Sequence, residues 1–131
     1  MRATSRSTDA QLRQAISVRG HRLTADEPTD QGGEDAGPSP QELLAASLAS
    51  CTAITMKMYA VRKGWHVGDM TVDVDYEPAQ RGSLTRFRMS VQMPKELPED
   101  QRERLMQIAA KCPVHRALES EVMFDERVEL V

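Results

Sequence analysis

The stretch that decides the fold is SPQELLAASLASCTAITMKMYAVRKG, residues 39–64. It opens with a helix-start pattern, because Ser39 can cap, Pro40 fits the first helical position and Glu42 completes a capping box. It closes with two cations followed by a glycine, which is the pattern typical of a helix C-terminus. The sequence therefore predicts one helix over residues 40–63.

Apolar residues occupy nearly every face of this predicted helix, so we expect it to be buried almost all round. Its length would be roughly 36 Å at about 1.5 Å per residue. A compact domain of this size has a radius of gyration of about 14 Å, so the helix would cross its whole width. One small subunit cannot cover such a helix on every side. The sequence therefore predicts a homodimer in which the helices of two subunits share a core.

Two strands are expected after the helix. Met70–Tyr76 and Phe87–Met93 each alternate apolar with polar residues, and a period of two is typical of a strand with one buried face. Pro78–Ser83 supplies a turn between them. These residues predict an antiparallel hairpin.

The N-terminal third is read in the same way. Ala15–Val18 and Leu23–Ala25 predict two short strands, and the Gly-His between them can form a turn. Residues 26–38 form a loop by composition, and residues 1–12 are polar and expected to be flexible.

The C-terminal third predicts helices over Glu99–Lys111 and Pro113–Ser120, followed by a last strand over Val122–Leu130. A chain of 131 residues has the length of one domain, so we expect a single domain covering residues 1–131.

Composition narrows the class of function. The chain has seventeen Lys and Arg and twenty Asp and Glu, so it lacks the excess of basic residues that is typical of nucleic-acid-binding proteins. No nucleic-acid partner is expected. With two cysteines and no secretory apolar segment near the N-terminus, the chain is expected in the cytoplasm. The long helix has the length of a membrane span, but Lys57 would cost about 2.5–3.5 kcal/mol near a bilayer centre. We expect no membrane partner.

The two cysteines are the candidate reactive groups. Cys112 precedes Pro113, so it is expected at the start of the short helix, where free N–H groups and the helix dipole favour a thiolate. Cys51 lies in the middle of the long helix and needs a partner brought in by the fold. A cysteine in an apolar helix is also commonly a small buried hydrophobe. Cys-x-x-His, formed with His115, lacks a second paired motif, so neither a metal nor a cofactor is expected.

Both cysteine segments resemble those of the OsmC family of organic hydroperoxide resistance proteins. The similar stretches are GPSPQELLAASLASCTAITM (37–56), YAVRKG (59–64), CPVHRAL (112–118), ADEP (25–28) and Gly32-Gly33. The resemblance covers residues 15–131 and includes both cysteines in order. It implies an α+β fold in an intertwined homodimer, with one long central helix per subunit wrapped by antiparallel β-sheets. It also implies active sites at the dimer interface.

The resemblance further implies a cysteine-based peroxidase. Cys51 would cleave the O–O bond of an organic hydroperoxide and become a sulfenic acid, and Cys112 would condense with it to a disulfide. An external dithiol would then reduce that disulfide. Apolar walls around Cys51 would favour fatty or aryl hydroperoxides over hydrogen peroxide.

The chain departs from the family pattern at the polar partners of the thiol. The family's catalytic glutamate stands ten positions before the peroxidatic cysteine, where this chain has Gln41. Glu42 follows, about 100° around the helix, and either takes the catalytic role in a rearranged site or leaves that role without a carboxylate. The family's arginine comes from the N-terminal segment, where Arg13 and Arg19 are the candidates. Two alternatives stay open: a non-catalytic small-molecule-binding dimer, and a redox sensor that uses the same disulfide.

Overall fold

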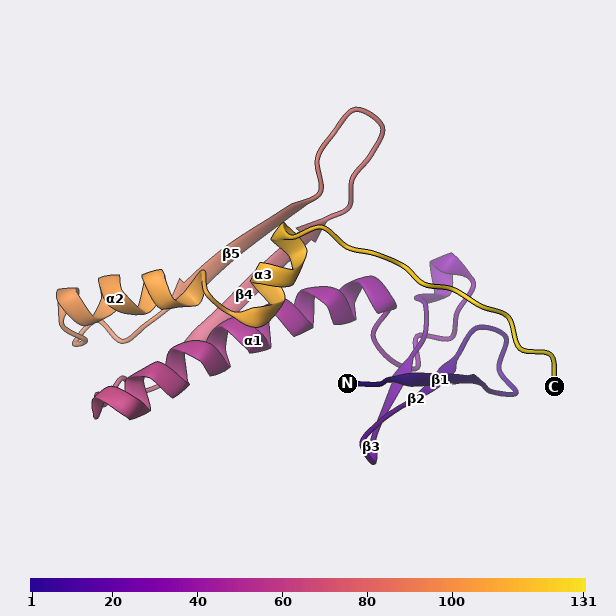
Figure 1. The fold of residues 1–131 in the computed structure, drawn as a ribbon, viewed down its shortest axis with the longest axis horizontal. Helices are drawn as coiled ribbons and strands as arrows, with labels where there is room; N and C mark the ends of the chain where they lie inside the picture. Colours follow the sequence, from indigo (N-terminus) through magenta and orange to yellow (C-terminus); the bar gives the residue numbers. More distant parts are fainter. The chain divides into compact units, whose positions relative to one another are not determined.

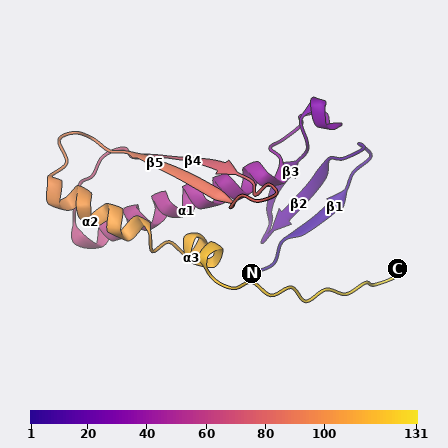
Figure 2. The ribbon, with the colours of Figure 1, turned by 90° about the horizontal axis from the view of Figure 1, so that it is seen from above.

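The computed structural model describes residues 1–131 and has an α+β fold (Figures 1 and 2). Its regular elements are β1 (Thr4–Ser7), β2 (Gln14–Val18), β3 (His21–Ala25), a 3-10 turn η1 (Thr29–Gln31), α1 (Pro40–Lys63), β4 (Thr71–Glu77), β5 (Arg86–Gln92), α2 (Glu99–Ala109) and α3 (Pro113–Glu119). The chain divides into two compact units. The first holds residues 1–46 and 76–87, and the second holds residues 47–75 and 88–131.

The first unit contains an antiparallel sheet of order β1-β2-β3. The predicted β2–β3 hairpin is confirmed: Val18 pairs with His21, and the turn residues Arg19 and Gly20 both have positive φ, 49° and 90°. The expectation for residues 1–12 needs correction, because Thr4–Ser7 pairs with β2 along its whole length. All four side chains of β1 are exposed, so this strand shows no apolar alternation in the sequence.

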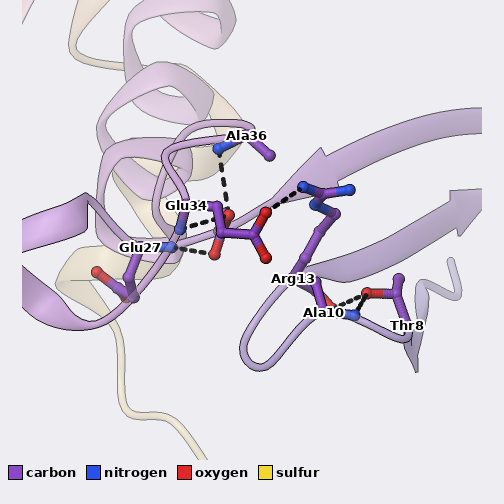
Figure 3. A network of polar contacts seen from close by, with 7 residues as sticks. Thr8, Ala10, Arg13, Glu27, Glu34 and Ala36 are labelled. Carbon is purple, nitrogen blue, oxygen red and sulfur yellow. Dashed lines mark hydrogen bonds and ion pairs between the residues drawn. The ribbon is translucent and has the colours of Figure 1, made fainter.

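The loop between β3 and α1 is built around the buried carboxylate of Asp26. Figure 3 labels the three residues whose backbone N–H groups donate to it, Glu27, Glu34 and Ala36. The carboxylate accepts backbone N–H bonds from Glu27 (2.8 Å), Glu34 (3.1 Å) and Ala36 (3.1 Å). Burial raises the pKa of Asp26, but these N–H groups and the charge of Arg13 outweigh it and leave the pKa below its ordinary value. The Asp26 carboxylate therefore holds the loop in place by accepting hydrogen bonds from three of its backbone N–H groups, which would otherwise need other partners.

The capping box at the start of α1 is confirmed. The backbone N–H of Ser39 donates to Glu42 Oε1 (2.9 Å), and the N–H of Glu42 donates to Ser39 Oγ (3.2 Å). Two amide groups that the helix leaves unpaired are thus satisfied reciprocally. The helix ends at Lys63, followed by Gly64 in the left-handed region with φ 70°.

The core of the second unit lies along one stripe of α1. Leu48, Thr52, Met56 and Ala60 are its buried residues and recur every four positions, which places them on one face. Met56 and Ala60 form a core cluster whose other buried members are Val67, Leu97, Leu105 and Ala109. By length and composition alone α1 could cross a membrane, and 22% of its apolar window is buried within the chain.

Burial of α1 almost all round, as the sequence predicts, is not seen within a single chain. Ile54 and Met58 are each 58% exposed, and Val61 is 75% exposed. These side chains line an open groove of about 480 Å³, together with Ala53 and Met70. The apolar surface that the sequence places on this side of the helix is therefore left uncovered by the chain's own residues.

The remaining elements confirm most of the predicted order. β4 and β5 form a two-stranded sheet and run in opposite directions (Figure 1). The last predicted strand is wrong for the single chain: residues 121–131 form neither helix nor strand and are exposed throughout. A strand needs a hydrogen-bonding neighbour, and these residues pair with no strand of their own chain.

Candidate functional site

Cys112 stands where the sequence predicts it, at the N-cap of α3 with Pro113 in the first turn. Its Sγ accepts a hydrogen bond from the backbone N–H of His115 (3.3 Å). The residue is completely buried. The start of α3 therefore supplies this sulfur with an amide donor, in the way a side-chain oxygen serves at an ordinary N-cap.

The neighbour of Cys112 on α1 is Thr52, which is also completely buried. Thr52 Oγ1 lies 3.7 Å from Cys112 Sγ. The same hydroxyl donates to the carbonyl oxygen of Leu48 (2.8 Å), one turn earlier in the helix. Residues 60 positions apart in the chain thus meet where α3 begins against α1.

Cys51 is half-buried, and its thiol interacts directly with that of Cys112 in the same chain. Both cysteines are free thiols. Cys51 also receives a backbone hydrogen bond from Val114, in the first turn of α3, and a side-chain hydrogen bond from Thr55. The partner that the mid-helix cysteine needs is therefore the start of α3.

Burial is the largest influence on Cys51 and raises the pKa of its thiol. The adjacent Cys112 raises this pKa further, because two neighbouring sulfurs resist a second negative charge. The hydrogen bonds from Val114 and Thr55 act in the opposite direction, but the pKa of Cys51 still lies above its ordinary value. The resting site is thus a pair of thiols in which only Cys51 reaches the surface.

One further side-chain pair, His115 and Glu119, lies on α3 beside this site. His115 Nδ1 is 2.9 Å from Glu119 Oε1, across one helical turn, although the geometry is not that of a hydrogen bond. The chain contains no group of three or more His, Cys, Asp or Glu residues arranged to hold a metal ion.

Four other sequence candidates lie in the first compact unit, whereas the cysteines lie in the second. Gln41 is exposed, and Arg19 occupies the exposed β2–β3 turn. Arg13 forms an ion pair with Glu34 at 3.1 Å. Glu42 is engaged in the cap of α1, where the bonds from Ser39 lower its carboxyl pKa. Catalytic roles for these residues remain predictions.

Three groups at the site were not identified from the sequence: the hydroxyls of Thr52 and Thr55 and the backbone N–H of Val114. Thr55 carries a recognisable signal, because it stands four positions after Cys51 on a helix and so shares its face. Thr52 and Val114 meet the cysteines only through tertiary packing, which no local pattern reports.

Comparisons with known proteins find relatives of this chain. The family model described as OsmC-like protein matches residues 32–127. An uncharacterized protein of Haloferax volcanii is 27% identical over 97 residues, covering 72% of this chain and 74% of its own length.

Solved structures share the fold. An OsmC-like protein of Mycoplasma pneumoniae superposes with a TM-score of 0.75 at 18% identity, covering 90% of this chain and 86% of the other. The organic hydroperoxide resistance protein OsmC of Legionella pneumophila gives a TM-score of 0.59 at 21% identity, covering 88% and 86%. These structures share the fold of the chain, and the family match over most of the sequence shows that the chain belongs to the family of OsmC-like proteins.

Proposed function

We propose that this chain is a thiol peroxidase that reduces organic hydroperoxides with Cys51 and Cys112. The observation that carries the proposal is the direct contact of two free thiols at the junction of α1 and α3, one half-buried and one buried. Membership of the OsmC-like family supports it, as does the fold shared with a protein named for organic hydroperoxide resistance.

The reaction takes place in three steps. The Cys51 thiol gives up its proton, and the thiolate attacks the terminal, hydroxyl-bearing oxygen of the hydroperoxide. The O–O bond breaks, Cys51 becomes a sulfenic acid, and the departing alkoxide takes up the released proton and leaves as an alcohol. Cys112 sulfur then attacks Cys51 sulfur and displaces hydroxide, which leaves as water with the Cys112 proton. A dithiol in the cytoplasm finally reduces the disulfide by exchange and is itself oxidised.

The geometry supports Cys51 as the attacking sulfur. A peroxide can approach only the thiol that reaches the surface, and Cys112 is completely buried. A negative charge on Cys51 has donors at hand in Val114 and Thr55. Cys112 interacts with Cys51 before any reaction, so the sulfur that resolves the sulfenic acid is already a neighbour of the one that forms it.

A homodimer is part of the same proposal. The apolar groove on α1 is lined by Ile54, Met58 and Val61, and the exposed segment 121–131 carries further apolar residues. An uncovered apolar surface of this kind marks a protein contact. A second copy that places its own α1 against the groove would give the central helix the burial its sequence demands.

The proposal is tested by measuring whether the protein consumes hydroperoxide over many catalytic cycles. The parent should consume cumene hydroperoxide continuously with dithiothreitol in excess and prefer it to hydrogen peroxide. Cys51→Ser should consume none, whereas Cys112→Ser should reduce one equivalent and then over-oxidise. Equal first-turnover rates for Cys51→Ser and the parent would exclude Cys51 as the attacking thiol.

Two observations favour a second candidate function, a non-catalytic small-molecule-binding dimer; a redox sensor that oxidises once is the other alternative. The pKa of Cys51 is raised, which reduces the thiolate fraction at neutral pH, and Gln41 stands in place of the family's glutamate. A sensor would form the disulfide with one equivalent of hydroperoxide but show no sustained consumption with dithiol present. A non-catalytic binder would keep both thiols.

A further inference from the structure

Thr52 holds a position that the proposed reaction does not yet explain. It is a polar residue in the buried stripe of α1, between Leu48 and Met56, and it is completely buried. A β-branched apolar residue of the same size would fill that space without a hydroxyl to satisfy. The hydroxyl makes two contacts, with the carbonyl oxygen of Leu48 and with Cys112 Sγ.

Counting protons fixes the direction of both contacts. A threonine hydroxyl has one proton to donate and can accept on its oxygen. A carbonyl oxygen only accepts, so at 2.8 Å the Thr52 proton belongs to the bond with Leu48. The contact at 3.7 Å is then donated by the Cys112 S–H to Thr52 Oγ1. The S–H of Cys112 is thus directed at Thr52 on α1, while the backbone N–H of His115 on α3 donates to the Cys112 sulfur.

This arrangement assigns different tasks to the two sulfurs. The proton of Cys112 is directed at Thr52, in the interior, while the Cys112 sulfur remains in contact with Cys51. When Cys112 gives up its proton to attack, the Thr52 hydroxyl proton can turn about the Cβ–Oγ1 bond and donate to the sulfur that is becoming negative. Leu48 loses little, because its carbonyl oxygen is in mid-helix and retains its backbone bond.

We propose that Thr52 is a positioning residue for disulfide closure: it orients the Cys112 thiol in the reduced site and stabilises the sulfur as it attacks Cys51. The inference rests on the proposed function for its chemical step, in which the Cys112–Cys51 bond forms, the Cys51–oxygen bond breaks and water leaves. Oxidation of Cys51 by the peroxide does not require the Thr52 hydroxyl.

The experiment separates the two steps. Thr52→Val removes the hydroxyl and keeps the shape, Thr52→Ser keeps the hydroxyl, and Thr55→Val is the matched control on the Cys51 side. Rapid mixing with cumene hydroperoxide, acid quenching and mass measurement would follow sulfenic acid and disulfide separately. Thermal unfolding of each variant would confirm folding, and Thr52→Ala would replace Thr52→Val if that variant does not fold.

Each of the two valine variants should slow a different step of the reaction. Loss of one hydrogen bond to the attacking sulfur should slow closure about three- to tenfold in Thr52→Val and leave the oxidation step at the parent rate. Sulfinic acid should accumulate at high peroxide in this variant, because the sulfenic acid lives longer. Thr52→Ser should close at the parent rate. Thr55→Val should instead slow the oxidation step.

Two results would overturn the inference: closure in Thr52→Val at the parent rate, or equal slowing in Thr52→Val and Thr52→Ser, which would mean packing alone. Diamide separates this inference from the proposed function, because it joins two thiols without a peroxide. A parent that is inert to hydroperoxides but is closed by diamide, more slowly in Thr52→Val, would refute the peroxidase and retain the role of Thr52.

Discussion

The uncovered face of α1 gives the prediction that is easiest to quantify. Ile54 and Met58 are each 58% exposed and Val61 is 75% exposed, and all three line the same groove. If a second copy covers this groove, a lysine in place of Ile54 must weaken the dimer. The substitution leaves the buried stripe of α1 unchanged, so each subunit should still fold.

The size of the effect follows from the exposed fraction. Fully burying an isoleucine side chain contributes about 1.5–3 kcal/mol, so covering the exposed part of Ile54 contributes about 1–1.5 kcal/mol. A two-fold interface contains each residue twice. Ile54→Lys should therefore cost about 2–3 kcal/mol, which raises the dissociation constant roughly 30- to 150-fold. Burial of two ammonium groups would add to this cost.

Sedimentation velocity across a concentration series measures this directly. The parent should sediment as a dimer, and Ile54→Lys should dissociate at far higher concentrations. Leu84→Lys is the control, because Leu84 is 83% exposed, lies in the β4–β5 connection and is not among the residues that line the groove. Circular dichroism would show that both variants fold. A parent that is monomeric throughout, or an Ile54→Lys variant indistinguishable from it, would refute the reasoning.

Three further predictions concern the site and the core. Because the pKa of Cys51 is raised in the folded chain, the rate of Cys51 oxidation should keep rising as the pH passes the ordinary cysteine pKa of about 8.5. The free energy of unfolding should fall over the same pH range, since the Cys51 thiol loses its proton at a lower pH in the unfolded chain than in the folded chain. A pH-independent rate above neutrality would contradict this. Leu105→Ala should lower the free energy of unfolding by about 2–5 kcal/mol in urea titrations, because Leu105 is completely buried in the core cluster; a loss below 1 kcal/mol, on the order of a surface change, would be inconsistent with that burial. Glu42→Ala should lower the melting temperature through loss of the capping box and leave the first-turnover rate unchanged, and a large loss of rate would instead give Glu42 a catalytic role.

Local signals were enough to predict most of the elements. The capping box and the terminal cations bound α1, and alternation located β4 and β5, because these patterns depend on neighbours within a few residues. Pro113 placed Cys112 at the start of α3 for the same reason. β1 was missed because its four side chains are all exposed and carry no pattern.

The candidate site could be predicted only in part. Both thiols could be named from the sequence, but their environment depends on packing between α1 and α3. The buried hydroxyl of Thr52 looks like any helix-interior threonine in the sequence. The C-terminal strand shows the opposite failure: an apolar pattern over residues 122–130 is present, but within one chain it has no strand to pair with.

The central claim is that Cys51 and Cys112 of one chain act as a redox pair on organic hydroperoxides. Its most direct test is peptide mapping after reduced protein meets one equivalent of cumene hydroperoxide and is quenched and alkylated. We predict a Cys51–Cys112 crosslink within a single chain, formed within seconds and removed by dithiothreitol. Two alkylated thiols, with the hydroperoxide left intact, would contradict it.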